Sequence, residues 1–312
     1  METLISRPYA GSAELPRLID LLQTSRAVES VDPWPPIHEM RHYLRAAGPD
    51  LLPNTRVWEN RAGAPMAFAT IWDGATLVMC VHPQAQSDEL AAQIVDWAVG
   101  RAREQGRASS DQPTLLVPVL TEDASTSALL QRHGFAAEDW SILRMGCQLD
   151  EPIPAPQLPE GFRLRPVASA EELAVAAAMH QEVFVAASTV VRDRLALSEG
   201  SQDIQAIDLV AETPDGAFAA FCLCSASRDF DTRHYRHEGW IDLLGTRPAY
   251  RRRGLGRAAL LAGLRLLADQ GVDIALLGTT SWNVAAQRLF TSSGFRTMHQ
   301  LRWFAWEAND HA

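Results

Sequence analysis

Apolar positions in the first half of the chain switch between a helical spacing of three to four residues and a strand spacing of two. Helical runs with turn signals at their ends predict helices, and short apolar runs bounded by Gly, Asp or Pro predict strands. The strands expected on this basis are residues 3–7, 56–60, 66–72, 76–81, 115–119 and 142–149. One helix is expected to start at Ser12, and three more are expected at residues 37–47, 87–105 and 124–133.

The second half carries the same kind of pattern after a proline-rich stretch. Residues 150–160 contain four prolines and no periodicity, which is typical of an extended linker. Beyond it, strands are expected at residues 163–167, 208–212, 217–225, 274–278 and 297–306, with one more strand ending at Thr246. Helices are expected at residues 170–186, 190–197, 256–270 and 283–292.

The order of elements repeats between the halves. Pro83 and Pro248 differ by 165 residues, and Gly134 and Gly294 differ by 160, so the order strand, two helices, three strands, helix, strand, helix, strand occurs twice. We therefore expect an α/β protein with two similar domains, at residues 1–149 and 161–312, joined by the linker at 150–160. Each domain should have a mixed, twisted sheet flanked by helices.

Composition narrows the functional classes. The 312 residues carry a net charge of −10, which disfavours broad binding of nucleic acid or anionic membranes. The four cysteines show neither metal-ligand spacing nor a disulfide framework, so no metal is expected. No apolar run is long enough for a membrane span, and the N-terminus lacks a signal-peptide pattern, so a cytoplasmic protein is expected. The oligomeric state is left open.

The strongest chemical signal is a basic glycine loop between a strand and a helix. Arg251, Arg252 and Arg253 precede Gly254 and Gly256, and apolar residues at helical spacing follow. Glycines allow a ligand to approach the backbone, and a helix N-terminus offers unpaired N–H groups to a phosphate. Arginines at this end oppose the helix dipole, so an anion site explains them better than a solvated helix cap does.

This loop resembles the acetyl-CoA signature of the GNAT N-acetyltransferases, because Arg251, Gly254 and Gly256 have the spacing Arg-x-x-Gly-x-Gly. A second block, with Asn283, Ala286, Leu289 and Phe290 followed by Gly294 and Phe295, agrees in order and spacing. The resemblance covers residues 160–306 and implies a tandem GNAT-like chain. It implies an acetyl-CoA site at Leu244, Gly245, Thr246, Arg251, Arg252, Arg253, Gly254, Leu255, Gly256, Arg257, Asn283 and Phe290.

The first half lacks these cofactor residues. Ser87, Asp88 and Glu89 stand where the second half has Arg252, Arg253 and Gly254. Ser87 is expected to cap the helix, and the two carboxylates favour the helix dipole but repel a pyrophosphate. We therefore expect residues 1–149 to be a degenerate GNAT-like domain without acetyl-CoA, which is either structural or forms one wall of the acceptor site.

The resemblance implies direct attack of an amine on the thioester, with the acetyl carbonyl polarised by a backbone N–H near residues 244–246. Asp242 and Glu238 are the candidate bases, because residues 238, 240, 242 and 244 share one face of a regular strand. Alternatively, Asp242 pairs with Arg247 or Arg302. His180 and His237 are weaker candidates.

The sequence departs from the family pattern at the residue that would donate a proton to the leaving thiolate. The family usually has a tyrosine at this position, and this chain has Phe290, which lacks a hydroxyl. The thiolate therefore leaves unaided or takes a proton from Thr291, Ser292 or water. The expected function is N-acetyl transfer to the primary amine of a small molecule. The alternative is a non-catalytic acyl-CoA sensor, which Phe290 favours, whereas Asp242 and Glu238 favour an enzyme.

Overall fold

The structure is a computed structural model that describes residues 3–28, 40, 44, 51–72, 74–108, 114–184, 204–227 and 237–308. The helix expected at residues 190–197 and most of the one at 37–47 lie outside these residues. The chain forms two compact units, one of residues 1–142 with 299–312 and the other of residues 143–298.

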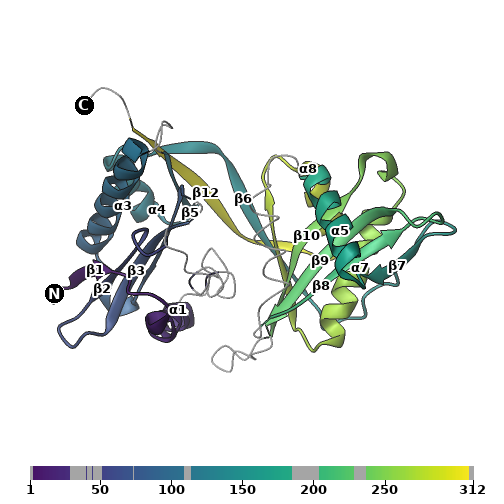
Figure 1. The fold of residues 1–312 in the computed structure, drawn as a ribbon, viewed down its shortest axis with the longest axis horizontal. Helices are drawn as coiled ribbons and strands as arrows, with labels where there is room; N and C mark the ends of the chain where they lie inside the picture. Colours follow the sequence, from purple (N-terminus) through teal and green to yellow (C-terminus); the bar gives the residue numbers. More distant parts are fainter. Residues whose placement is uncertain are drawn as a thin grey trace. The chain divides into compact units, whose positions relative to one another are not determined.

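The elements of the first half follow the expected order (Figure 1). They are β1 (Ile5–Pro8), η1 (Ser12–Glu14), α1 (Leu15–Val28), β2 (Thr55–Glu59), β3 (Pro65–Trp72), β4 (Thr76–Val81), η2 (Pro83–Ala85), α3 (Asp88–Ala108), β5 (Thr114–Leu120), α4 (Ala124–Arg132) and β6 (Ala136–Gln148).

The second half repeats them. Its elements are β7 (Arg163–Pro166), α5 (Ala170–Val183), β8 (Ile204–Glu212), β9 (Phe218–Ser227), β10 (Glu238–Thr246), η3 (Pro248–Tyr250), α7 (Leu255–Asp269), β11 (Ile274–Thr280), α8 (Val284–Thr291) and β12 (Arg296–Glu307). The α/β class with mixed sheets and flanking helices is thus confirmed.

The last strand of each half contributes to the sheet of the other half. In the first unit, β12 pairs antiparallel with β5, from Leu301 opposite Leu120 to Glu307 opposite Thr114. In the second unit, the end of β6 lies beside β11. The compact units therefore differ from the linear division expected at residues 149 and 161. Alternation of apolar residues specifies that a strand forms but not which strand it pairs with.

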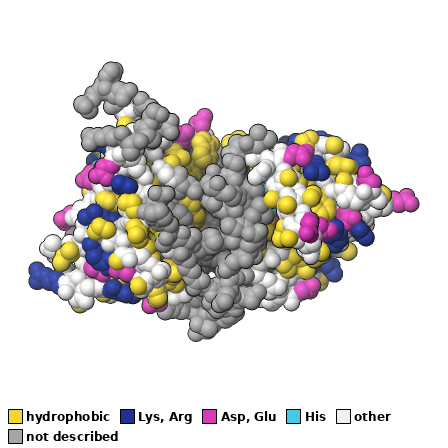
Figure 2. All heavy atoms as spheres, viewed as in Figure 1, with side chains coloured by type: hydrophobic (Ala, Val, Ile, Leu, Met, Phe, Trp, Pro, Cys, Tyr) yellow, Lys and Arg dark blue, Asp and Glu magenta, His cyan; other side chains and the backbone are white. Residues whose placement is uncertain are grey.

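Each sheet is covered by helices on both faces. In the second unit, apolar side chains of α7 pack with Cys222, Cys224 and Ile241 on one face. On the other face, Ala176 and Met179 of α5 pack against Phe221 and Leu243. The first unit has the same plan, with α3 on one face and α1 on the other. Acidic, basic and hydrophobic side chains are interspersed on the visible surface of each unit (Figure 2).

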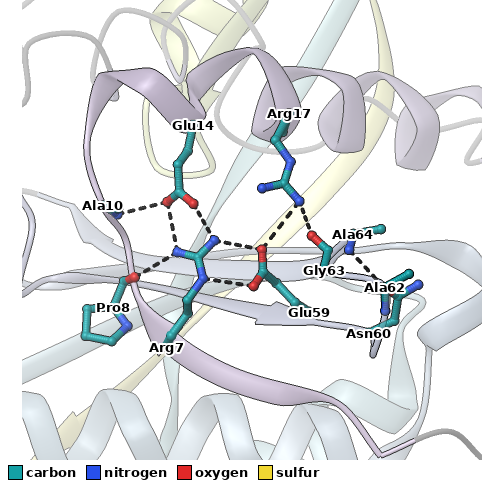
Figure 3. A network of polar contacts seen from close by, with 10 residues as sticks. All are labelled: Arg7, Pro8, Ala10, Glu14, Arg17, Glu59, Asn60, Ala62, Gly63 and Ala64. Carbon is teal, nitrogen blue, oxygen red and sulfur yellow. Dashed lines mark hydrogen bonds and ion pairs between the residues drawn. The ribbon is translucent and has the colours of Figure 1, made fainter.

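An ion cluster fastens the first strand of the first unit to its neighbours (Figure 3). The Arg7 guanidinium donates to both Glu59 oxygens, at 2.8 and 2.7 Å, and to Glu14. The Ala10 N–H also donates to Glu14, at 2.8 Å. The cluster ties β1, the start of the first helix and β2 together, and the raised pKa of Arg7 reflects its two carboxylate partners.

The second unit contains the same cluster at the equivalent positions. Arg165 donates to both Glu172 oxygens at 2.7 Å and to Glu212, and the Ala168 N–H donates to Glu172 at 2.9 Å. The repeat thus extends to individual hydrogen bonds. The Arg165 guanidinium and the Ala168 N–H hold the pKa of Glu172 at about 2.

Replacement of Arg165 by glutamine should therefore destabilise the protein at neutral pH and have less effect in acid. A carboxylate whose pKa is lowered by folding stabilises the fold above its unfolded pKa of about 4.3, and this stabilisation is lost as the pH falls through its folded pKa. Melting temperatures of wild type and Arg165→Gln should differ at pH 7 and converge towards pH 2. A difference that is the same at both pH values would contradict this account.

Candidate active site

Strands β10 and β11 diverge at the centre of the second unit. They are parallel neighbours, but their register covers only Glu238 to Trp240 opposite Ile274 to Leu276. The remaining residues of β10, up to Thr246, are thus unpaired with β11 and pair only with β9 among the described strands. The carboxyl-terminal half of β10 therefore has an open side towards β11.

The N–H groups of Leu244 and Thr246 point to this open side. The Arg247 N–H donates to Ala219 O at 2.9 Å, so residue 247 and its partner on β9 exchange hydrogen bonds. Facing pairs in an antiparallel ladder alternate between bonded and non-bonded types. Gly245 is therefore bonded to Phe221 on β9, and the N–H groups on either side of Gly245 point away from β9.

A β-bulge at Asp242 changes which residues share a face. Ile241 lies opposite Cys224 and Leu243 opposite Leu223, so Asp242 is the extra residue of β10. Ile241 and Leu244 both pack on the α7 side, whereas Leu243 packs on the α5 side. The expectation that residues 238, 240, 242 and 244 share one face is thus wrong, since a bulge interrupts the period of two.

The two candidate carboxylates are half-buried on β10, Glu238 at its start and Asp242 at the bulge. Burial raises the pKa of Cys224 to about 12, and the Asp242 and Asp208 carboxylates add to this rise. Cys222 is fully buried with a pKa raised in the same way. These two cysteines are therefore protonated core residues, as their spacing on one apolar strand indicates.

Arg247 and Arg302, the two arginines weighed as partners of Asp242, have other surroundings. Arg247 pairs with Glu182 at 3.0 Å and donates to Phe218 O at 3.0 Å. Arg302 lies on the part of β12 that pairs with β5 in the first unit.

The glycine loop folds into a tight, exposed turn ahead of α7. Gly254 has φ 82°, a left-handed conformation that glycine adopts at little cost, and Arg252, which lacks that freedom, also has a positive φ of 65°. The first helical hydrogen bond runs from Ala258 N to Gly254 O at 3.0 Å, so the N–H groups of residues 255–257 precede the helical ladder. These donors and the exposed side chains of Arg251, Arg252 and Arg253 lie at the end of β10.

Gly256 keeps this helix start close to the strand. A Cβ atom at Gly256 would lie 3.2 Å from Thr246 Oγ1, tighter than an ordinary contact. Arg251 Nε donates to Thr246 O at 3.2 Å, which fastens the loop to the same strand end. The close approach of strand, loop and helix is what a phosphate-bearing ligand needs in order to reach backbone donors.

The remaining predicted residues lie on or beside α8. Arg257 donates to Ser292 Oγ at 2.9 Å and to Ser292 O at 3.1 Å, so its side chain fastens α7 to the end of α8. Asn283 caps α8, because its Oδ1 accepts from Ala286 N at 3.2 Å. Phe290 is 6% exposed and packs 5.8 Å from the Phe295 ring in the α7-side core.

The equivalent helix start in the first unit differs as expected. Ser87 Oγ accepts from Leu90 N at 3.2 Å, which confirms the predicted cap, and Asp88 and Glu89 occupy the first turn of α3. This end of α3 therefore presents carboxylates where α7 follows three arginines.

Sequence reasoning missed Arg144, which β6 brings into the second unit. Its side chain is 1% exposed, and its guanidinium lies 4.5 Å from the centre of the Trp240 ring. An arginine inside an apolar strand was the available signal, but its surroundings depend on the strand exchange.

Among the described residues, no three His, Cys, Asp or Glu side chains form a cluster that could hold a metal ion. No helix in this part of the chain is long and apolar enough to cross a membrane.

Comparison with known proteins agrees with this geometry. The model of the acetyltransferase (GNAT) family matches residues 195–295. The mycothiol acetyltransferase of Thermobispora bispora is 29% identical over 166 residues, which span 50% of this chain and 53% of that protein. The mycothiol acetyltransferase of Rhodococcus erythropolis is 30% identical over 273 residues, 76% of this chain and 83% of that protein.

A solved tandem GNAT protein from the clavulanic acid biosynthesis pathway has the same fold, with a TM-score of 0.76 at 19% identity over 99% of this chain and all of that one. The two-module layout is also similar to that of mycothiol synthase. The chain therefore belongs to the GNAT family of acetyltransferases, and it is a tandem member of that family.

Proposed function

We propose that the second unit transfers an acetyl group from acetyl-CoA to the primary amine of a small molecule, with both substrates bound at once. The observation that carries this proposal is the open side of β10, where the N–H groups of Leu244 and Thr246 point away from β9 just before the glycine loop. Donors fixed in advance at the place where charge develops on a carbonyl oxygen are the main source of catalysis in acyl transfer.

The residues at this site suit acetyl-CoA as the co-substrate. The N–H groups at the start of α7 and the side chains of Arg251, Arg252 and Arg253 would bind the pyrophosphate. Gly254, Leu255 and Gly256 would let it approach the backbone. Gly245 and Asn283 would line the pantetheine arm. Arg257 and Phe290 would support this site through α8, since the first binds Ser292 and the second lies in the core.

The proposed reaction needs one proton removed and one supplied. The amine nitrogen forms a bond to the thioester carbon, and the carbon–sulfur bond breaks. A free amine with a pKa near 10 is mostly protonated at pH 7, so Asp242, with Glu238 as the second candidate, accepts its proton. The departing thiolate, whose thiol has a pKa of about 8.5, takes its proton from solvent.

The names of the relatives support a small-molecule acceptor, since two of them are called mycothiol acetyltransferase. Incubation with acetyl-CoA and a panel of small amines, including mycothiol-related amines, tests the proposal by release of free thiol. If the chain binds CoA but releases no thiol with any amine, the alternative of a non-catalytic acyl-CoA sensor would be favoured. The missing hydroxyl at Phe290 is the feature that supports this alternative.

Replacement of Phe290 by tyrosine should raise kcat, most visibly at low pH, because the new hydroxyl can donate a proton to the thiolate. The gain should stay below the ~10²-fold that a well-placed general acid supplies, since the ring is buried against Phe295. Initial rates between pH 6 and 9 measure it. A flat profile would show that thiolate departure is not limiting, and a large loss of rate would show that the phenyl ring is required for packing.

A further inference from the structure

A buried ionisable pair lies behind the open side of β10. His180 of α5 is 0% exposed and Asp208 of β8 is 8% exposed, and His180 Nε2 lies 3.3 Å from Asp208 Oδ2. The two groups are in contact without hydrogen-bond geometry. Within the part of the chain that the structure describes, the ring nitrogens of His180 and the carboxylate oxygens of Asp208 therefore make no hydrogen bond. His180 is thus too deeply buried to serve as the base for a substrate amine.

The pair is connected to the proposed carbonyl site through one aromatic ring. The His180 and Phe221 ring centres are 4.1 Å apart. Phe221 lies opposite Gly245 on β10, where an added Cβ atom would come within 2.5 Å of the phenyl ring and 2.8 Å of Val183. The ring therefore rests directly on the peptide backbone between Leu244 and Thr246.

The first unit shows that the fold does not need this pair. The repeat places Leu22, Thr55 and Phe68 where the second unit has His180, Asp208 and Phe221. The sheet registers agree, since Thr55 faces Thr70 as Asp208 faces Leu223, and Phe68 faces Cys80 as Phe221 faces Gly245.

The first unit thus buries a leucine and a hydroxyl at these positions. Thr55 Oγ1 and Thr70 Oγ1 are 2.8 Å apart, and Leu22 and Phe68 belong to the α1-side core. Desolvation of a buried polar pair is costly, so its replacement by well-packed apolar groups is often neutral or stabilising. Retention of the pair in the unit that has the glycine loop therefore points to a role other than stability.

We propose that His180 and Asp208 are positioning residues for the acyl-transfer site. They hold Phe221 against Gly245 and so fix the direction of the Leu244 and Thr246 N–H groups. This inference rests on the proposed function. The pair does not touch the substrate, and its effect should appear in the polarisation of the acetyl carbonyl rather than in the affinity for CoA.

The test is to replace the pair by apolar side chains with the double variant His180→Leu/Asp208→Val in the full chain. Valine is used instead of the first unit's threonine because Leu223 stands opposite Asp208, where Thr70 stands opposite Thr55 and shares its hydroxyl contact. We expect kcat to fall about 10- to 10²-fold, the range for a misplaced reacting group, with KM for acetyl-CoA and the calorimetric Kd for CoA unchanged. The melting temperature should stay the same or rise. The single variant His180→Leu is less informative, because it leaves a buried carboxylate without its partner.

Infrared spectra of bound acetyl-CoA with a ¹³C label at the carbonyl give a second readout that needs no turnover. The carbonyl stretch should lie below its solution frequency in the wild-type complex and move back towards it in the double variant. The matched control, Leu22→Met/Thr55→Val in the first unit, should change neither kcat nor the carbonyl band.

A double variant with the wild-type kcat and with its carbonyl band at the frequency of the wild-type complex would overturn the positioning role. A joint loss of kcat, CoA affinity and melting temperature would overturn it as well, because the pair would then be structural. Failure of the wild-type chain to bind acetyl-CoA or release thiol would instead count against the proposed function.

Discussion

Replacement of Gly256 by glutamate should abolish CoA binding by the whole chain. The new side chain would start 3.2 Å from Thr246 Oγ1, at the end of the helix where the arginines gather. A carboxylate facing a phosphate costs about 1 kcal/mol at 4 Å in water and about 4 kcal/mol in a partly buried site. It would also occupy the space through which the ligand reaches the N–H groups of α7. Calorimetric titration of the full chain measures the effect.

The first unit supplies the matched control for this variant. Ala91 of α3 stands where α7 has Gly256, so Ala91→Glu adds the same charge to the equivalent helix start. It should leave the stoichiometry at one CoA per chain, as should Asp88→Ala. Because Gly256 is closely packed, the melting temperature of Gly256→Glu must be shown to stay near that of wild type. CoA binding that survives Gly256→Glu, or two equivalent sites in wild type, would contradict a silent first unit.

Replacement of Asp242 by asparagine should lower kcat by about 10²- to 10⁴-fold, the usual contribution of a general base. Asparagine preserves the size of the side chain at the bulge but cannot accept the proton of an ammonium group at neutral pH. The affinity for acetyl-CoA should hardly change, because the bulge precedes the glycine loop by several residues. Steady-state rates between pH 6 and 9 and a CoA titration measure the two effects separately.

Glu238→Gln distinguishes the two carboxylates. If Asp242 is the base, the glutamine variant should retain most of the rate, since Glu238 lies at the start of β10, where the strand is still paired with β11. The reverse ranking would transfer the role to Glu238. Turnover of Asp242→Asn at the wild-type rate across the whole pH range would remove Asp242 from the mechanism.

Local features of this chain were predictable because short stretches of sequence determine them. Ser87 and Asn283 cap helices because each side chain reaches an N–H three residues ahead. Gly254 starts α7 in a left-handed conformation that glycine accommodates. The repeat of elements followed from turn residues at matching offsets, and it is visible again in the ion clusters around Arg7 and Arg165.

Features that depend on distant partners were not predictable. The bulge at Asp242 exists only relative to β9, and it moved Leu244 to the face opposite the one expected. The exchange of β6 and β12 is a choice of strand partner, which alternation does not encode, and it decides that Arg144 lies over Trp240. His180 and Asp208 lie on different elements, α5 and β8, and no sequence pattern between them predicts that their side chains meet.

The most direct test of the central claim is mass spectrometry of a panel of small amines incubated with acetyl-CoA and the full chain. One amine should gain the mass of a single acetyl group, with release of an equal amount of free CoA thiol, and both products should disappear with Gly256→Glu but persist with Ala91→Glu. An acetylated product that forms equally well with Gly256→Glu would contradict acyl transfer at the second unit.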